Sequence, residues 1–288
     1  MPLVKVGEML REAKKEQRCV AAFNCHNYEA IKCVIDAGAA LRAPVIVMLY
    51  PTVISHIPLS TFALITKDLA EKSRYPVGLH LDHSCDPDFI LEAVKAGFQS
   101  VIVDASRFDY ETNVRLTRQV VEAVRPLGAD IEAEIGFVGA AGSAEDYTDA
   151  AKYTDPQEAK RFMEDTQVDT LAIAIGNAHG HYVVEPRLDI SVLKEINRLV
   201  DVPLVLHGGS GIPDSQLKDA VKNGIAKANY GTDFGRYIFA AQEAYMYGDG
   251  EGKHAFGLLK AGEDGGREYA EGRIRVLGGY STGKPTPL

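Results

Sequence analysis

The chain has 288 residues, 46% hydrophobic and 25% charged, a composition typical of a folded enzyme and too apolar for a disordered chain. Its formal charge of −9, with no run rich in Lys or Arg, argues against a nucleic-acid-binding surface. Residues 1–17 lack the apolar core of a signal peptide, and no run approaches the length needed to cross a membrane, so we expect a cytoplasmic protein.

Short apolar runs rich in β-branched residues alternate along the chain with longer segments of helical periodicity. Repeated strand–helix alternation predicts a parallel sheet, and eight repeats in this length favour a closed barrel over an open doubly wound sheet. We predict an α/β protein with a (β/α)8 TIM barrel, one domain over residues 1–288, with a less regular C-terminal extension from about residue 248. The eight runs are VAAFN (20–24), PVIVML (44–49), VGLHLD (77–82), SVIVDA (100–105), DIEAEI (130–135), TLAIAI (170–175), VPLVLH (202–207) and IAKANY (225–230).

Local signals mark the ends of the intervening helices. Asp189 and Asp214 are expected N-caps, and Pro156 is expected in a first turn. Two pieces of the extension, AFGLLKAG and EYAEGRIRVL, are candidate terminal helices that would either cap the barrel or contact a partner subunit. The glycines expected to end helices are Gly38, Gly97 and Gly224.

The four cysteines, Cys19, Cys25, Cys33 and Cys85, lack CxxC spacing and lie in apolar segments. Buried, reduced thiols without a chemical role are therefore expected.

Functional side chains of such barrels lie at the C-terminal ends of the strands. Three predicted strands, the third, sixth and seventh, each bring a histidine there, which is the ligand number of a catalytic zinc ion that keeps one position for substrate. His83 and His207 are two of these, and either His179 or His181 is the third. Asp82 directly precedes His83 and should project differently, as a proton-transfer group.

Two further carboxylates, Asp104 and Glu134, end the fourth and fifth predicted strands. They would form a second, oxygen-rich cation subsite, orient the metal-binding histidines, or be helix-cap or surface carboxylates without a role in the site.

Glycine-rich loops follow the seventh and eighth predicted strands, where many barrels hold a phosphate on backbone amides and a helix N-terminus. The first loop contains Gly208, Gly209, Ser210 and Gly211, and the second runs from Asn229 to Thr232. The sequence therefore indicates a phosphate site between them.

These features together resemble the class II, metal-dependent ketose-bisphosphate aldolases. The resemblance spans roughly residues 5 to 245, in order along the chain. It rests on AAFNCHN (21–27), HLDH (80–83), SVIVDAS (100–106), IEAEIG (131–136), YTDP (153–156), AIAIGNAHG (172–180), PLVLHGGSGIP (203–213) and KANYGTD (227–233).

The resemblance implies a role for each matching residue. Asp82 would be the acid/base, and His83, His179 and His207 would bind zinc, with Asp104 and Glu134 at an alternative metal position. A monovalent cation would be a further candidate cofactor, and the protein would be a homodimer or homotetramer. The residues implied to hold the dihydroxyacetone phosphate part of a sugar phosphate are Asn24, Gly180, Gly208, Gly209, Ser210, Asn229, Tyr230, Gly231 and Thr232.

The chain departs from the family pattern at several positions. In relatives, a small hydroxyl or glycine-rich segment commonly faces the far end of the substrate. Tyr50 stands at that position here, and this replacement argues against a second phosphate site. Glu145 is the candidate for a carboxylate on the loop after the fifth strand, although that loop differs in length. His181 and Gly231 also replace the usual residues.

The expected reaction is zinc-dependent, reversible cleavage of fructose 1,6-bisphosphate or tagatose 1,6-bisphosphate to dihydroxyacetone phosphate and glyceraldehyde 3-phosphate. A modified or singly phosphorylated ketose is the alternative substrate. Two rival interpretations are a Schiff-base enzyme using Lys227 and a non-catalytic barrel that binds a phosphosugar.

Overall fold

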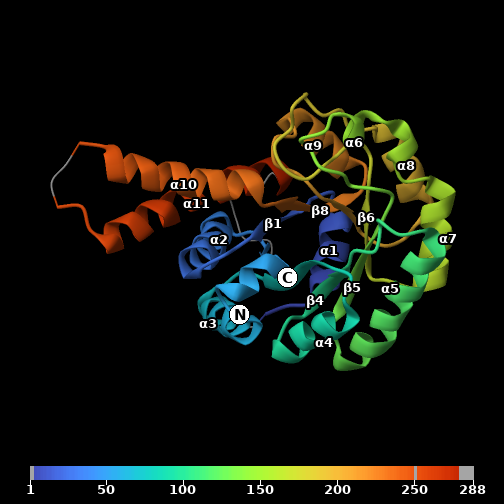
Figure 1. The fold of residues 1–288 in the computed structure, drawn as a ribbon, viewed down its shortest axis with the longest axis horizontal. Helices are drawn as coiled ribbons and strands as arrows, with labels where there is room; N and C mark the ends of the chain where they lie inside the picture. The colour runs from blue at the N-terminus through green and yellow to red at the C-terminus, as the bar shows by residue number, and fades with distance from the viewer. Residues whose placement is uncertain (1–2, 250–251, 279–288) are drawn as a thin grey trace.

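The computed structural model describes residues 3–249 and 252–278. Within them the chain forms a closed barrel of eight parallel strands in sequential order, in which β8 pairs with β1 (Figure 1). This confirms the (β/α)8 prediction. The strands are β1 (Val20–Asn24), β2 (Val45–Leu49), β3 (Val77–Ser84), β4 (Ser100–Val103), β5 (Asp130–Ile135), β6 (Thr170–Ile173), β7 (Leu204–Leu206) and β8 (Ile225–Tyr230).

Helices surround the barrel and cover its outer face. None of the helices in the described ranges is both long and apolar enough to span a bilayer. The α-helices are α1 (Val6–Lys15), α2 (Tyr28–Leu41), α3 (Leu59–Lys72), α4 (Pro87–Ala96), α5 (Tyr110–Val124), α6 (Glu145–Thr148), α7 (Pro156–Thr166), α8 (Ile190–Leu199), α9 (Asp214–Lys222), α10 (Thr232–Tyr247) and α11 (Ala255–Gly278). Short 3-10 turns are η1 (Pro51–Ser55), η2 (Arg125–Leu127) and η3 (Ala150–Lys152).

The amphipathic helix α1 closes the N-terminal end of the barrel. Its Val6 and Leu10 are buried in a cluster with Val20 and Ile46 of the first two strands. The amide of Gly7 donates a hydrogen bond to Asp130 Oδ2 at 2.9 Å and so attaches the helix to β5. α1 therefore fills the N-terminal end of the barrel, opposite the strand ends where functional side chains of such barrels lie.

Most predicted helix signals are confirmed. Asp189 caps α8 through its side chain, Pro156 begins α7, and Gly97 and Gly224 adopt the left-handed conformation after α4 and α9. Asp214 is the first residue of α9 and not its cap, which is Pro213.

The predicted helix end at Gly38 is wrong, because α2 continues to Leu41. A Cβ at Gly38 would lie 2.8 Å from Val45 Cγ1, so glycine here permits close packing of α2 on β2.

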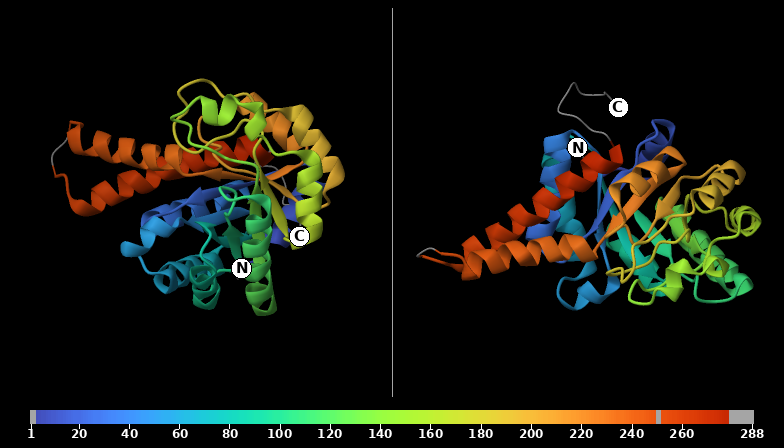
Figure 2. Two further views of the ribbon diagram at one scale, coloured as in Figure 1. Left: turned by 45° about the vertical axis from the view of Figure 1, so that its right-hand side comes forward. Right: turned by 90° about the horizontal axis from the view of Figure 1, so that it is seen from above.

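The C-terminal extension is more regular than the sequence indicated, since most of its described part is the 24-residue helix α11. α10 and α11 run side by side and project from the barrel as an arm, which both views of Figure 2 show. The glycines in α11 made this segment look irregular in the sequence, because glycine disfavours a helix. Gly265 and Gly266 are needed for close packing against α10, since an added Cβ would collide with Ala241 and Ile238.

Three of the cysteines, Cys19, Cys25 and Cys33, are buried as expected, and all four are free thiols. Cys85 is only partly buried, because it follows β3 at the edge of the site.

Candidate active site

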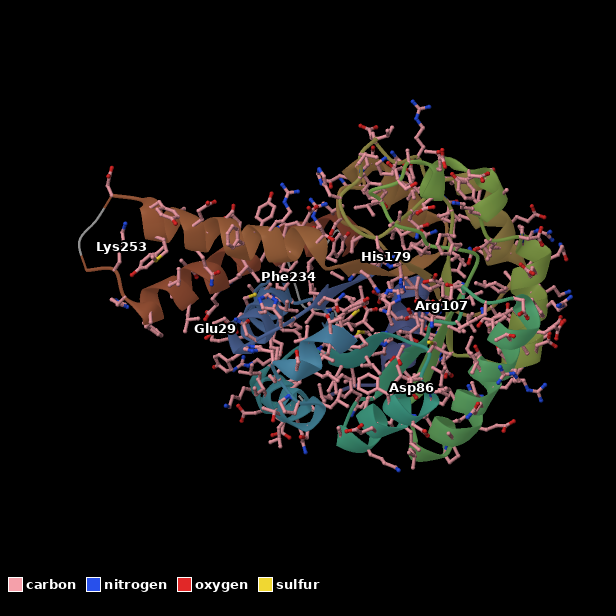
Figure 3. All side chains as sticks on the ribbon, viewed as in Figure 1. Glu29, Asp86, Arg107, His179, Phe234 and Lys253 are labelled. Atoms are coloured by element: carbon pink, nitrogen blue, oxygen red, sulfur yellow. The ribbon has the colours of Figure 1, made fainter. Side chains whose placement is uncertain are left out.

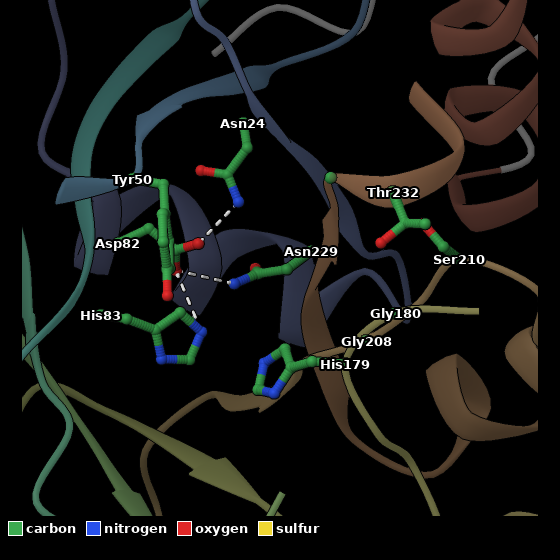
Figure 4. A pocket seen from close by; sticks show the side chains of 11 residues that line it. Asn24, Tyr50, Asp82, His83, His179, Gly180, Gly208, Ser210, Asn229 and Thr232 are labelled. Atoms are coloured by element: carbon green, nitrogen blue, oxygen red, sulfur yellow. Dashed lines mark hydrogen bonds and ion pairs between the residues drawn. The ribbon is translucent and has the colours of Figure 1, made fainter. Parts of the chain in front are cut away.

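A cavity opens at the C-terminal end of the barrel, where the sequence predicted the functional residues. Side chains from opposite walls converge on it (Figure 4), and Figure 3 labels His179 among the surrounding side chains. Among the described residues, no lysine or arginine lines this cavity. The lining residues are Asn24, Tyr50, Asp82, His83, His179, Gly180, Gly208, Ser210, Asn229, Gly231 and Thr232.

An irregular end of β3 brings Asp82 and His83 into the cavity together. The pairing of β3 with β4 shifts register between Leu81 and Ser84, and His83 adopts a left-handed φ of 44°. This conformation is costly for a residue with a Cβ and is typical of functional positions. Adjacent residues of a regular strand would point to opposite faces, so the irregularity lets both side chains serve one site.

Asp82 is buried and held from two sides. Asn24 Nδ2 donates to its Oδ2 at 2.7 Å, and Asn229 Nδ2 donates to its Oδ1 at 3.3 Å (Figure 4). Burial by itself would raise the pKa of Asp82, but the charge of His83, other neighbouring cations and the Asn24 hydrogen bond outweigh burial and lower it. The carboxylate is therefore ionised and fixed, ready to accept a proton.

Three histidines meet beside Asp82. His83, His179 and His207 each direct a ring nitrogen at a common point, with these atoms within 4.8 Å of one another. The structure thus brings His179 into the cluster, whereas His181 is exposed and lies 3.4 Å from Arg236 Nη1.

In each of the three rings, the nitrogen that faces away from the common point has a polar partner. Asp104 Oδ2 lies 2.8 Å from His83 Nδ1, the Val138 carbonyl lies 3.3 Å from His179 Nδ1, and Glu132 Oε1 lies 2.9 Å from His207 Nε2. His179 Nε2 is buried and has no hydrogen-bond partner. A buried nitrogen without a partner, facing two other imidazoles, fits a metal ion, because three imidazole nitrogens are a common donor set. In the metal-free site burial lowers the pKa of His83, but Asp82 and Asp104 outweigh burial and raise it to about 10, so a metal ion would take the place of the His83 proton.

A second group of donors shares His83. Asp104 and Glu134 lie with it close enough to hold a cation. Ser106, which the sequence analysis did not assign, donates from its hydroxyl to Asp104 Oδ1 or Glu134 Oε1, each at 2.9 Å. Burial, followed by the charge of Asp104, raises the pKa of Glu134 to about 8.

The loop after β6 holds His179 and the start of the glycine-rich loop in one unit. Tyr182 donates its hydroxyl proton to the Gly208 carbonyl at 3.0 Å and accepts the Ala178 amide at 2.7 Å. Gly208 has a φ of +63°, and a Cβ there would lie 1.9 Å from the Ala178 carbonyl oxygen. Only glycine fits this close approach.

Two predicted substrate contacts are not placed in the cavity. The Tyr230 ring points outward from β8 and stacks on Phe23, with 5.6 Å between ring centroids, because side chains alternate along a strand and Asn229 points inward. The Gly209 amide donates to the Asn229 carbonyl at 3.0 Å and is not free for a phosphate. Glu145 is exposed at the start of α6 and does not line the cavity either.

Lys227 does not reach the cavity and cannot serve as the Schiff-base residue in this conformation. Its side chain is fully buried, and its ammonium group contacts Glu132 Oε2 at 2.8 Å and His80 Nε2 at 3.3 Å.

A family model described as fructose-bisphosphate aldolase class-II matches residues 4–284. The chain belongs to the class II fructose-bisphosphate aldolase family. It is thus an aldolase, a lyase of a metal-dependent family that acts on sugar phosphates.

Solved structures agree with membership of the class II aldolases. The YdjI aldolase from Escherichia coli K12 is similar at 33% identity with a TM-score of 0.87, and the match covers 98% of this chain and 100% of that one. The fructose-bisphosphate aldolase from Campylobacter jejuni has a TM-score of 0.81 at 22% identity, covering 96% of this chain and 95% of that one, and it supports the fold alone.

Proposed function

We propose that this class II aldolase uses zinc to cleave a ketose phosphate reversibly into dihydroxyacetone phosphate and an aldehyde. The observation that carries the proposal is the convergence of three imidazole nitrogens beside an ionised, doubly hydrogen-bonded Asp82. His83 and His179 would bind zinc through Nε2 and His207 through Nδ1, with Asp104 and Glu134 as an alternative metal position. A monovalent cation remains a candidate second cofactor.

The metal would stabilise the negative charge that develops on the ketose oxygens when the C3–C4 bond breaks. Asp82 would remove the C4 hydroxyl proton during cleavage and return it during condensation. Asn24 and Asn229 fix the carboxylate in the geometry that this transfer requires.

The phosphate of the dihydroxyacetone phosphate part would lie between Gly208, Ser210 and Thr232. Thr232 is the first residue of α10, whose N-terminal dipole is favourable for an anion, and the Asp233 amide there donates to Ser210 Oγ at 3.1 Å. Gly180 and Gly231 lack side chains and leave room beside it.

The substrate candidates differ at the far end of the ketose. Fructose and tagatose 1,6-bisphosphates fit the family, but a second phosphate would have to bind without a lysine or arginine among the described lining residues. The partly exposed Tyr50 instead places an aromatic ring 6.0 Å from that of His83. This favours a modified or singly phosphorylated ketose as the second candidate.

The test is a coupled assay for dihydroxyacetone phosphate release from a panel of ketose mono- and bisphosphates, with and without EDTA followed by zinc. Release that EDTA abolishes and zinc restores is expected. The ratio of kcat/KM between mono- and bisphosphates identifies the substrate class. Release that survives complete metal removal would refute the proposal.

We also propose that the protein is a cytoplasmic homodimer or homotetramer whose subunits contact one another through the arm. Large apolar side chains are exposed along it, with Phe239 65% and Tyr247 84% exposed. Such side chains on a projecting element are typical of an interface.

A further inference from the structure

A layer of ionisable side chains lies inside the barrel, directly beneath the residues that line the cavity. Asp82, Glu134 and Asn229 approach the cavity from β3, β5 and β8, and two residues earlier on the same strands stand His80, Glu132 and Lys227. Spacing by two keeps each pair on the inner face. All three lower residues are fully buried, and the mechanism above uses none of them.

The lower layer is one connected chain of polar contacts. Lys227 Nζ donates to Glu132 Oε2 at 2.8 Å and approaches His80 Nε2 at 3.3 Å, while His80 Nδ1 lies 2.8 Å from Ser100 Oγ. The second oxygen of Glu132, Oε1, lies 2.9 Å from His207 Nε2. The chain therefore ends on one of the three clustered histidines.

A gain in folding stability does not explain why the ion pair of Lys227 and Glu132 is fully buried. Desolvating an ammonium and a carboxylate costs several kcal/mol each, and replacing a buried pair by apolar side chains of similar volume is often neutral or stabilising. The alternative is that the pair holds a neighbouring side chain in a fixed orientation. A carboxylate on the far ring nitrogen of a metal-binding histidine fixes both its tautomer and its orientation.

The geometry at His207 matches such a role. Glu132 can only accept when ionised, so His207 Nε2 carries the proton and Nδ1 has the free lone pair. That Nδ1 lies 3.1 Å from His83 Nε2, on the side of the histidine cluster. A ring flip would leave the carboxylate facing a carbon and would turn the lone pair away from the other ligands.

We propose that Glu132 and Lys227 are positioning residues for the metal site: Glu132 fixes His207 with Nδ1 toward the metal, and Lys227 fixes Glu132. This inference rests on the proposed function, because it takes the three histidines as metal ligands. Neither residue touches substrate.

The test compares the wild type with Glu132→Gln and with the double variant Glu132→Gln/Lys227→Met, which leaves no unpaired buried charge. Ser100→Ala is the matched control, since it alters the same layer at His80 without touching Glu132 or His207. Zn²⁺ affinity is measured by competition with a chromophoric chelator, and ligand geometry by the visible absorption of Co²⁺-substituted protein. Thermal unfolding of the metal-free proteins reports folding.

We expect both Gln variants to bind Zn²⁺ about 10–100-fold more weakly, with an altered Co²⁺ spectrum, while the control matches the wild type in both. A folded double variant with wild-type affinity and spectrum would overturn the inference and leave the proposed function intact. If neither Gln variant folds, Glu132→Asp decides, because it keeps the charge but withdraws the carboxylate from His207. Wild-type protein that binds neither metal would overturn the proposed function and this inference with it.

Discussion

At the scale of single residues, Asp82 carries the most specific prediction. Asp82→Asn keeps the size of the side chain but replaces one of the two oxygens that accept from Asn24 and Asn229 with an NH2 group and removes the proton acceptor, so kcat should fall about 10²–10⁴-fold. Metal content, measured by elemental analysis, should stay at the wild-type stoichiometry because Asp82 is not among the clustered ligand atoms. A variant with more than a tenth of wild-type kcat would exclude Asp82 as the acid/base.

Glu134 gives a prediction on stability and pH. Its pKa, raised by burial and then by Asp104 from an ordinary value of 4.5 to about 8, is higher in the folded than in the unfolded chain. The contribution of Glu134 to the free energy of unfolding is therefore fully present below pH 4.5 and is lost as the pH rises through 8. Metal-free wild type should lose stability relative to Glu134→Gln between pH 5 and 8.

The loss should reach a few kcal/mol, since each pKa unit corresponds to about 1.4 kcal/mol. Urea unfolding of both EDTA-treated proteins across this pH range measures it. Parallel stability curves for the two proteins would contradict the assigned pKa shift.

The sequence allowed prediction of the residues that converge on the cavity, because His83, His179 and His207 all follow apolar strands. The strand pattern alone could not rank His179 against His181, since loop geometry decides which ring turns inward; the family resemblance favoured His179. Ser106 and any role for Glu132 were also missed, because these depend on which residues of neighbouring strands share a layer. A motif does not distinguish backbone from side-chain contacts, so it could not show that the Tyr230 ring points away from the cavity.

At the scale of secondary-structure elements, the strands were well predicted because buried parallel strands are continuous apolar runs. β1, β5 and β8 have the predicted bounds, whereas β4, β6 and β7 are shorter. Their last predicted residues lie outside the strands; Asp104, for example, follows β4, although its amide still donates to the Ser84 carbonyl of β3 at 2.9 Å. Such departures depend on contacts between strands and cannot be predicted from one strand alone.

Glycines within helices provide a prediction at this scale. Gly38→Ala gains up to about 1 kcal/mol of helix propensity, but its Cβ would lie 2.8 Å from Val45 Cγ1 and 3.0 Å from the Ala43 carbonyl oxygen. Because overpacking costs about 1–3 kcal/mol, we expect a net loss of unfolding free energy in urea.

Gly272→Ala in α11 is the control, since, apart from its chain neighbours and the nearby backbone of its own helix, no atom of the described residues lies within 4 Å of its added Cβ. It should be neutral or stabilising. Equal effects of the two substitutions would show that contact between α2 and β2 does not require glycine.

At the scale of the whole molecule, the arm leads to a prediction about assembly. Phe239→Asp together with Tyr247→Asp should reduce the number of chains per particle, because charges would replace exposed apolar side chains. Light scattering after size exclusion measures the mass. Leu64→Asp, at a position 68% exposed on α3, is the control and should change nothing. Wild-type protein that is already monomeric would refute the proposed assembly.

That the chain forms one domain stays a prediction.

Closing the barrel brings together segments of the chain that the ribosome synthesises at widely separated times. β1 pairs with β8, which begins about 200 residues later, and the Cys19 amide beside β1 donates to the Leu277 carbonyl at the end of α11. At a translation rate of roughly 5–20 residues per second, β8 is synthesised on the order of 10–40 seconds after β1. During that interval an apolar strand has an open edge, and the nascent protein should depend on chaperones until the arm has been synthesised.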